Sequence, residues 1–151
     1  MRRFLIKLLT TFFGTGYSPI APGSAGSLAA AAIIWFFIPN NSIHYIIIIF
    51  ILLPIVAWLC GHGKDFWGKT DARKIVIDEA LGMAITYIWI PKKIPLFLIG
   101  FLLFRLYDIV KIPPASRAEK IPGGWGVLLD DVISGIYANI GLWILILLTG
   151  V

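Results

Sequence analysis

Charged residues are scarce in this chain. Aspartate, glutamate, lysine and arginine make up 14% of its 151 residues, whereas 59% are hydrophobic, and the mean hydropathy is +0.91. A water-soluble domain of this length could not bury so much apolar surface. The composition therefore predicts an integral membrane protein, for which lipid is part of the solvent.

Cysteine and histidine are almost absent. Cys60 stands alone, which excludes an internal disulfide and a cysteine-rich zinc site. His44 and His62 belong to no H-E-x-x-H motif, and the chain also lacks a C-x5-R phosphatase loop, a D-x-D nucleophile motif and a Walker loop. The basic residues behind the net charge of +5 are scattered between apolar runs, which is typical of flanks that orient membrane spans and argues against nucleic acid as a partner.

We predict an all-α fold, a single domain over residues 1–151, built as an integral membrane bundle of about five spans. A helix needs about 20 apolar residues to cross the hydrocarbon. Residues 1–13 share a basic start and an apolar stretch with signal peptides but lack a small-residue cleavage site. We therefore expect a retained amphipathic helix at the membrane interface. The expected spans are residues 23–38, 43–60, 75–90, 94–110 and 125–148.

The basic residues also predict the orientation. With a cytoplasmic N-terminus, ten basic residues flank the spans inside, only Lys92 and Lys93 lie outside, and Arg105 falls within the fourth span. We therefore expect the N-terminus in the cytoplasm and the C-terminus outside. The ten inside are Arg2, Arg3, Lys7, Lys64, Lys69, Arg73, Lys74, Lys111, Arg117 and Lys120.

Five of the eight acidic residues lie inside or against the apolar segments. A carboxylate near the centre of a membrane helix costs about 2.5–3.5 kcal/mol. In the predicted orientation all five lie at the cytoplasmic ends of three spans, so segments far apart in sequence converge at one depth and predict a site there. They are Asp78, Glu79, Asp108, Asp130 and Asp131.

The glycine- and proline-rich segment 14–26 precedes the first span. Its composition forbids regular helix until about Gly23, and Ser24 could cap the helix that follows. Free amides at such a helix start suit a phosphate. Close helix packing through small residues explains the segment equally well.

Two acidic pairs point to a metal. Asp78 and Glu79 are adjacent in a helix and point about 100° apart, so one can face a cation while the other braces a neighbour. Acids also favour a helix N-terminus for electrostatic reasons alone. Asp130 and Asp131 follow a glycine loop and suit a hard cation such as magnesium. We expect these four carboxylates to hold the metal between them.

Arg105, Asp108 and Lys111 are spaced i, i+3, i+6 and form one polar stripe on the fourth span. A self-neutralising Arg105–Asp108 pair and a snorkelling Lys111 are the structural alternatives. We expect the two cations to bind a phosphate.

Four motifs in order make the chain similar to a known family. They are G-x-G-x-S-P-x-A-P-G-S, D-E-x-x-G, F-R-x-Y-D-x-x-K and G-G-x-G-x-x-x-D-D-x-x-x-G, within residues 14–138. This set resembles phosphatidylglycerophosphatase A, a bacterial integral membrane enzyme family that removes the terminal phosphate of phosphatidylglycerophosphate. The departures are small: Ser24 stands where the family often has Thr, Tyr107 where Phe is usual, Ser134 where Ala is common, and Ile112 where Pro is frequent.

The resemblance implies a magnesium-dependent lipid phosphatase of the bacterial cytoplasmic (inner) membrane, acting on a phospholipid in the cytoplasmic leaflet. It does not separate a carboxylate nucleophile from a metal-activated water, and it leaves open the number of metal ions, the oligomeric state and activity on other lipid phosphates. The implied catalytic residues are Asp78, Glu79, Asp108, Asp130 and Asp131, the metal ligands are Asp78, Glu79, Asp130 and Asp131, and the phosphate-binding residues are Arg105, Lys111, Gly23 and Ser24.

Two other functions would also place acids in membrane helices. A cation- or proton-coupled transporter subunit should carry its carboxylates near the midplane, but the outer halves of the predicted spans lack acids. A non-catalytic membrane subunit needs no concentration of paired acids beside basic residues. The sequence therefore favours the enzyme.

Overall fold

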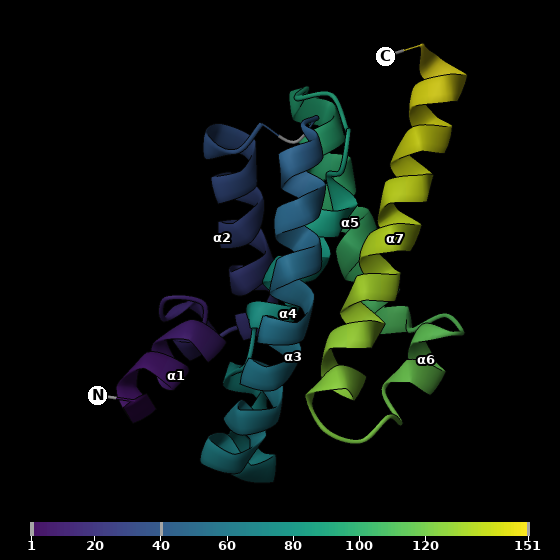
Figure 1. Cartoon of the computed structure of the whole chain (residues 1–151). Helices are drawn as coiled ribbons and strands as arrows, with labels where there is room; N and C mark the ends of the chain where they lie inside the picture. The colour runs from purple at the N-terminus through teal and green to yellow at the C-terminus, as the bar shows by residue number, and fades with distance from the viewer. Residues whose placement is uncertain (1, 40, 151) are drawn as a thin grey trace.

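The computed structural model describes residues 2–39 and 41–150, and every regular element in these ranges is a helix (Figure 1). For residues 2, 64–66 and 68–72 only the backbone is described. The predicted all-α fold is confirmed. The elements are α1 (Arg2–Thr10), η1 (Thr15–Tyr17), α2 (Pro22–Phe37), α3 (Ile43–Asp71), η2 (Ala72–Lys74), α4 (Ile77–Thr86), α5 (Ile94–Val110), α6 (Ala115–Ala118) and α7 (Gly124–Thr149).

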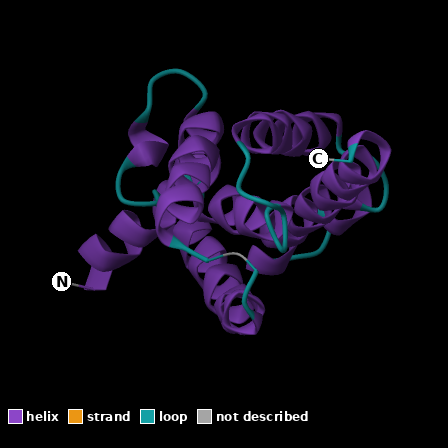
Figure 2. Cartoon of the chain, turned by 90° about the horizontal axis from the view of Figure 1, so that it is seen from above, coloured by secondary structure: helices purple, strands orange, loops and turns teal. Residues whose placement is uncertain are grey.

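The long helices α2, α3, α5 and α7 gather into a bundle, with α1 at its edge (Figures 1 and 2). Helix α4 packs against α7, α2, α3 and α5 and so forms the centre of the core. Large apolar side chains also cover the outside of the long helices, among them Phe50, Leu102 and Leu147. An outer surface of this kind is what a lipid environment selects.

Two helices are long and apolar enough to cross a membrane: residues Ile43–Gly63 of α3, and α7. Helix α2 has 16 residues and α5 has 17, and both are shorter than the usual 20. Their bounds lie within a residue of the predicted segments. Length and composition thus indicate a membrane protein, with two full-length candidate spans among the described residues.

Helix α4 is shorter than the predicted third span. Its ten residues extend over about 15 Å, half the thickness of the hydrocarbon. Its last carbonyls would be orphaned inside an apolar bundle, but side chains of other helices reach them. Tyr45 donates to the Ala84 carbonyl at 2.7 Å, and the Asn139 amide donates at 2.9 Å each to the carbonyls of Thr86 and of Ile88, which lies two residues beyond the helix.

Helix α3 is longer than predicted. The predicted span ends at residue 60, but the helix continues to Asp71, so His62 lies within the helix. The glycines there favour a loop by propensity, and packing overrides that preference. A side chain at Gly63 would collide with Ile75, which packs against this turn of α3.

Two glycines bring α4 and α7 into close contact. A Cβ at Gly82 would lie 2.5 Å from the Phe104 ring and 2.8 Å from the Asp131 carbonyl oxygen, and one at Gly135 would lie 2.5 Å from the Gly82 carbonyl oxygen. Small residues allow this backbone approach. It places the acidic first turn of α4 beside the acidic second turn of α7.

Candidate active site

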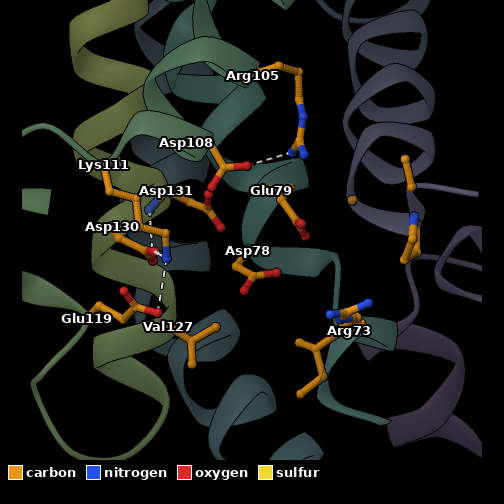
Figure 3. Close-up of a pocket in the computed structure, with 14 residues that line it drawn as sticks. Arg73, Asp78, Glu79, Arg105, Asp108, Lys111, Glu119, Val127, Asp130 and Asp131 are labelled. Atoms are coloured by element: carbon orange, nitrogen blue, oxygen red, sulfur yellow. Dashed lines mark hydrogen bonds and ion pairs between the residues drawn. The ribbon is translucent and has the colours of Figure 1, made fainter. Parts of the chain in front are cut away.

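A cavity of about 600 Å³ lies where α2, α4 and α7 begin and α5 ends (Figure 3). All five acids singled out from the sequence line this cavity, together with three cations. The acids lie in the first turn of α4, the last turn of α5 and the second turn of α7, at the helix ends that the sequence predicts. The lining residues are Ala21, Pro22, Gly23, Arg73, Ile75, Asp78, Glu79, Arg105, Asp108, Lys111, Glu119, Val127, Asp130 and Asp131.

Asp78, Glu79 and Asp131 form the acidic centre of the cavity. Each offers a carboxylate oxygen, and these oxygens all lie within 4.8 Å of one another. Asp78 Oδ1, Glu79 Oε2 and Asp131 Oδ1 are buried and have no hydrogen-bond partner among the described residues. Buried carboxylates this close repel one another unless a cation or protons compensate. A set of hard oxygen ligands suits Mg²⁺, so these three residues fit the predicted metal.

Asp130 has a different partner. Its Oδ2 accepts a hydrogen bond from the Lys111 ammonium at 2.8 Å, and its Oδ1 accepts one from the Asp131 amide at 3.1 Å. The same ammonium lies 3.0 Å from Glu119 Oε1. Asp130, which the sequence groups with the metal ligands, is thus held by a lysine and lines the cavity beside the other three acids.

Lys111 ends α5 in the left-handed conformation, with φ of 51°. Such a conformation in a residue other than glycine costs on the order of 1–3 kcal/mol, and residues of this kind often cluster at active sites. Partial burial lowers the pKa of the Lys111 ammonium. The hydrogen bonds and charges of Asp130 and Glu119 outweigh that effect and raise this pKa above its ordinary value, so Lys111 is a cation at neutral pH.

Arg105 occupies the upper side of the cavity in Figure 3. Its Nη1 lies 2.7 Å from Asp108 Oδ2 and 3.5 Å from Ser27 Oγ, while its buried Nε has no partner in the described part of the chain. The Arg105–Asp108 pair that the sequence left as an alternative is therefore present, and one donor of the guanidinium remains unused.

Of the two predicted residues at the start of α2, only Gly23 lines the cavity. A Cβ at Gly23 would collide with the Glu79 carboxylate and lie 3.3 Å from Arg105 Nη1. Ser24 is half-buried and lies outside the lining. Close packing against Glu79 thus explains why residue 23 is a glycine. Because Gly23 lies in the first turn of α2, the first amides of this helix are also near the cavity.

Two charged lining residues were missed as site residues. Glu119 is the one acid between the Lys111 motif and the Asp130-Asp131 motif, and this position was the available signal. In the sequence, Arg73 contributes only to the predicted membrane orientation. Its position five residues before Asp78 indicates no chemistry in the sequence, and only the packing of η2 against α3 and α2 brings Arg73 to the cavity.

Comparisons with known proteins support the enzyme interpretation. The family model of phosphatidylglycerophosphatase A matches residues 8–146. A Bacteroides thetaiotaomicron protein, provisionally named phosphatidylinositol-3-phosphatase, is 34% identical over 91% of this chain and 91% of its own length. The proteins of Escherichia coli and Haemophilus influenzae named phosphatidylglycerophosphatase A are each 34% identical, over 85% and 89% of this chain and 76% and 85% of their own lengths. No solved structure matches the chain significantly. Nothing in these similarities favours a transporter.

Proposed function

The chain belongs to the phosphatidylglycerophosphatase A family, and from this premise we propose that it hydrolyses the terminal phosphomonoester of phosphatidylglycerophosphate to phosphatidylglycerol and inorganic phosphate. One observation carries the proposal at the level of the site. Three carboxylates line the same cavity as Lys111 and Arg105, and each has a buried oxygen without a hydrogen-bond partner among the described residues. A phosphomonoester needs cations around its oxygens. Lys111 and Arg105 are two such cations in this cavity, and the three carboxylates are ligands for a metal cation.

Asp78, Glu79 and Asp131 would hold Mg²⁺, with Asp108 and Asp130 close by on α5 and α7. When bound, magnesium supplies positive charge to phosphoryl oxygens and acidifies water. Lys111 pairs with Asp130 and Glu119, and Arg105 with Asp108, so none of the ion pairs between described side chains neutralises Asp78, Glu79 or Asp131.

Lys111 and Arg105 would bind the phosphoryl oxygens. A lysine ammonium has three N–H donors, and its two carboxylate partners leave one for the substrate. Arg105 would contribute its unpartnered Nε–H. Charge moves onto the leaving oxygen during phosphoryl transfer, so fixed donors at both ends of the cavity stabilise the transition state. The first amides of α2, at Gly23 and Ser24, would add weaker donors.

We place the cavity at the cytoplasmic surface of a bacterial inner membrane. In this arrangement α2, α3, α5, α7 and the short α4 with its following turn make five crossings, with the N-terminus inside. The loop charges support that orientation. Helix α1 would lie in the interface, since its exposed Phe4 and Leu5 are apolar and Lys7 is basic.

The proposal is tested by phosphate release from the purified protein in mixed micelles. Phosphatidylglycerophosphate, phosphatidic acid and phosphatidylinositol 3-phosphate are compared, the last because of the name of the Bacteroides relative. We expect turnover of phosphatidylglycerophosphate that EDTA abolishes and Mg²⁺ restores. Absence of turnover in the presence of Mg²⁺ would refute the activity, and turnover that persists in EDTA would refute the metal requirement.

A further inference from the structure

A second cavity, of about 440 Å³, adjoins the active-site cavity. The two share Ala21, Pro22 and Arg73, so Arg73 lines both. The remaining residues that line the second cavity belong to the segment before α2 and to η2: Gly16, Tyr17, Ser18, Pro19 and Lys74.

The walls of this cavity are fixed by contacts between segments far apart in sequence. The Val76 amide donates to the Thr10 carbonyl at 2.9 Å, and a Cβ at Gly16 would collide with the Lys74 carbonyl. The Lys74 ammonium lies over two aromatic rings, 4.9 Å from the centre of Trp67 and 5.8 Å from that of Tyr17. The packing of the fold therefore defines the shape of this cavity, and cation–π contacts orient the Lys74 ammonium.

The charges of the two cavities are opposite. Six carboxylates and three cations line the active-site cavity, whereas the charged residues of the second cavity are Arg73 and Lys74, both cationic. Arg73 is exposed and forms no ion pair with any carboxylate whose side chain is described. In Figure 3, Arg73 and Lys111 lie on opposite sides of Asp78 and Glu79. Among the side chains that the structure describes, a second anion would therefore meet two cations and no carboxylate in this cavity.

The surroundings of the second cavity match the level of a lipid headgroup. Phe13, Tyr17 and Ile20 are 65%, 55% and 82% exposed on the segment that borders it. Exposed aromatic and apolar residues beside cations are typical of the membrane interface. An anion held here stays close to acyl chains that remain in the bilayer.

We infer that this second cavity binds the phosphodiester of the lipid substrate while the terminal phosphomonoester occupies the acidic cavity. The inference rests on the proposed function and deepens it. Arg73 becomes a specificity-determining residue, because it favours lipids that carry both a diester and a terminal monoester. A lipid phosphomonoester without the diester, such as phosphatidic acid, would leave the second cavity empty.

The test measures competitive inhibition of phosphatidylglycerophosphate hydrolysis in neutral-detergent micelles. Phosphatidylglycerol carries only the diester and phosphatidic acid only the monoester. We expect Arg73→Gln to raise the inhibition constant of phosphatidylglycerol about tenfold, the scale of one charged hydrogen bond, and to leave that of phosphatidic acid unchanged. Arg73→Lys should recover part of the loss. The matched control is Arg117→Gln, which removes an arginine that lines neither cavity.

Equal effects of Arg73→Gln on both inhibitors would overturn the inference, because Arg73 would then act on the terminal phosphate or through its general field. No effect on either inhibitor, or no inhibition of the unmodified enzyme by phosphatidylglycerol, would overturn it as well. An unmodified protein that does not hydrolyse phosphatidylglycerophosphate would instead refute the proposed function, so the two failures are distinguishable.

Discussion

At the scale of single residues, the clustered carboxylates of Asp78, Glu79 and Asp131 make the sharpest prediction. Asp131→Asn and Asp78→Asn keep the shape of the side chain but remove its charge, and each should lower kcat/KM by about 100-fold or more, since the cation loses a ligand. Both variants should need more Mg²⁺ for half-maximal activity. Glu119→Gln is the contrasting variant: Glu119 is more than half exposed, and its loss leaves Lys111 paired with Asp130, so turnover should fall only slightly.

Lys111 is the second test at this scale. Lys111→Ala should reduce transition-state stabilisation by about 2–4 kcal/mol, measured from kcat/KM, if its ammonium binds the phosphoryl group. Lys111→Arg keeps the charge with a changed geometry and should recover part of that loss. Unchanged kcat/KM in Lys111→Ala would show that the ion pairs with Asp130 and Glu119 serve the structure alone.

At the scale of elements, the contact between the start of α2 and α4 can be disturbed without replacing a charged residue. Gly23→Ala places a methyl group against the Glu79 carboxylate, and this carboxylate must move because the backbone of α2 is fixed by packing. We expect about a 100-fold loss of kcat/KM with little change in thermal stability. Gly61→Ala is the matched control, since its methyl group would lie 3.4 Å from the nearest atom, an ordinary contact. Full activity of Gly23→Ala would contradict the proposed role of Glu79.

At the C-terminal end of α4, a substitution should instead lower stability and leave activity unchanged. Asn139→Leu leaves the carbonyls of Thr86 and Ile88 without the Asn139 amide, and an unsatisfied buried carbonyl costs about 1–3 kcal/mol. Unfolding in detergent should therefore occur at a lower temperature or denaturant concentration, while the folded fraction keeps its kcat. Thr149→Val, at the exposed end of α7, should leave stability unchanged. Equal stability of the two variants would mean that water satisfies the end of α4.

At the scale of the whole molecule, the loop charges predict which end of the bundle faces the cytoplasm. A cysteine introduced at Lys120 should resist an impermeant thiol reagent in intact cells, whereas one at Asn41, at the other end of the bundle, should react. The native Cys60 is fully buried and should contribute no background. Labelling at Lys120 alone would reverse the orientation and with it the cytoplasmic placement of the active site.

Much of this organisation can be derived from the sequence alone. Composition indicates the membrane, and the apolar runs predict α2 and α5 nearly to the residue because prolines and loop residues bound them. The five acids are expected to converge, and they do, because each lies within two turns of the end of a helix. The sequence is sufficient for these features because residues near one another in the chain determine them.

Other features are decided by contacts between distant segments. Helix α3 continues past residue 60, where its glycines pack against other elements. Helix α4 can end early inside the bundle because Tyr45 and Asn139 satisfy carbonyls at its end. Contacts between distant segments also decide the roles of the two adjacent aspartates in the site. The sequence does not distinguish them, but Asp130 pairs with Lys111 at the end of α5, whereas Asp131 lies with Asp78 and Glu79. Only the close contact of α4 with α7 at Gly82 and Gly135 distinguishes them, because the direction in which a side chain points relative to another helix depends on how the helices pack.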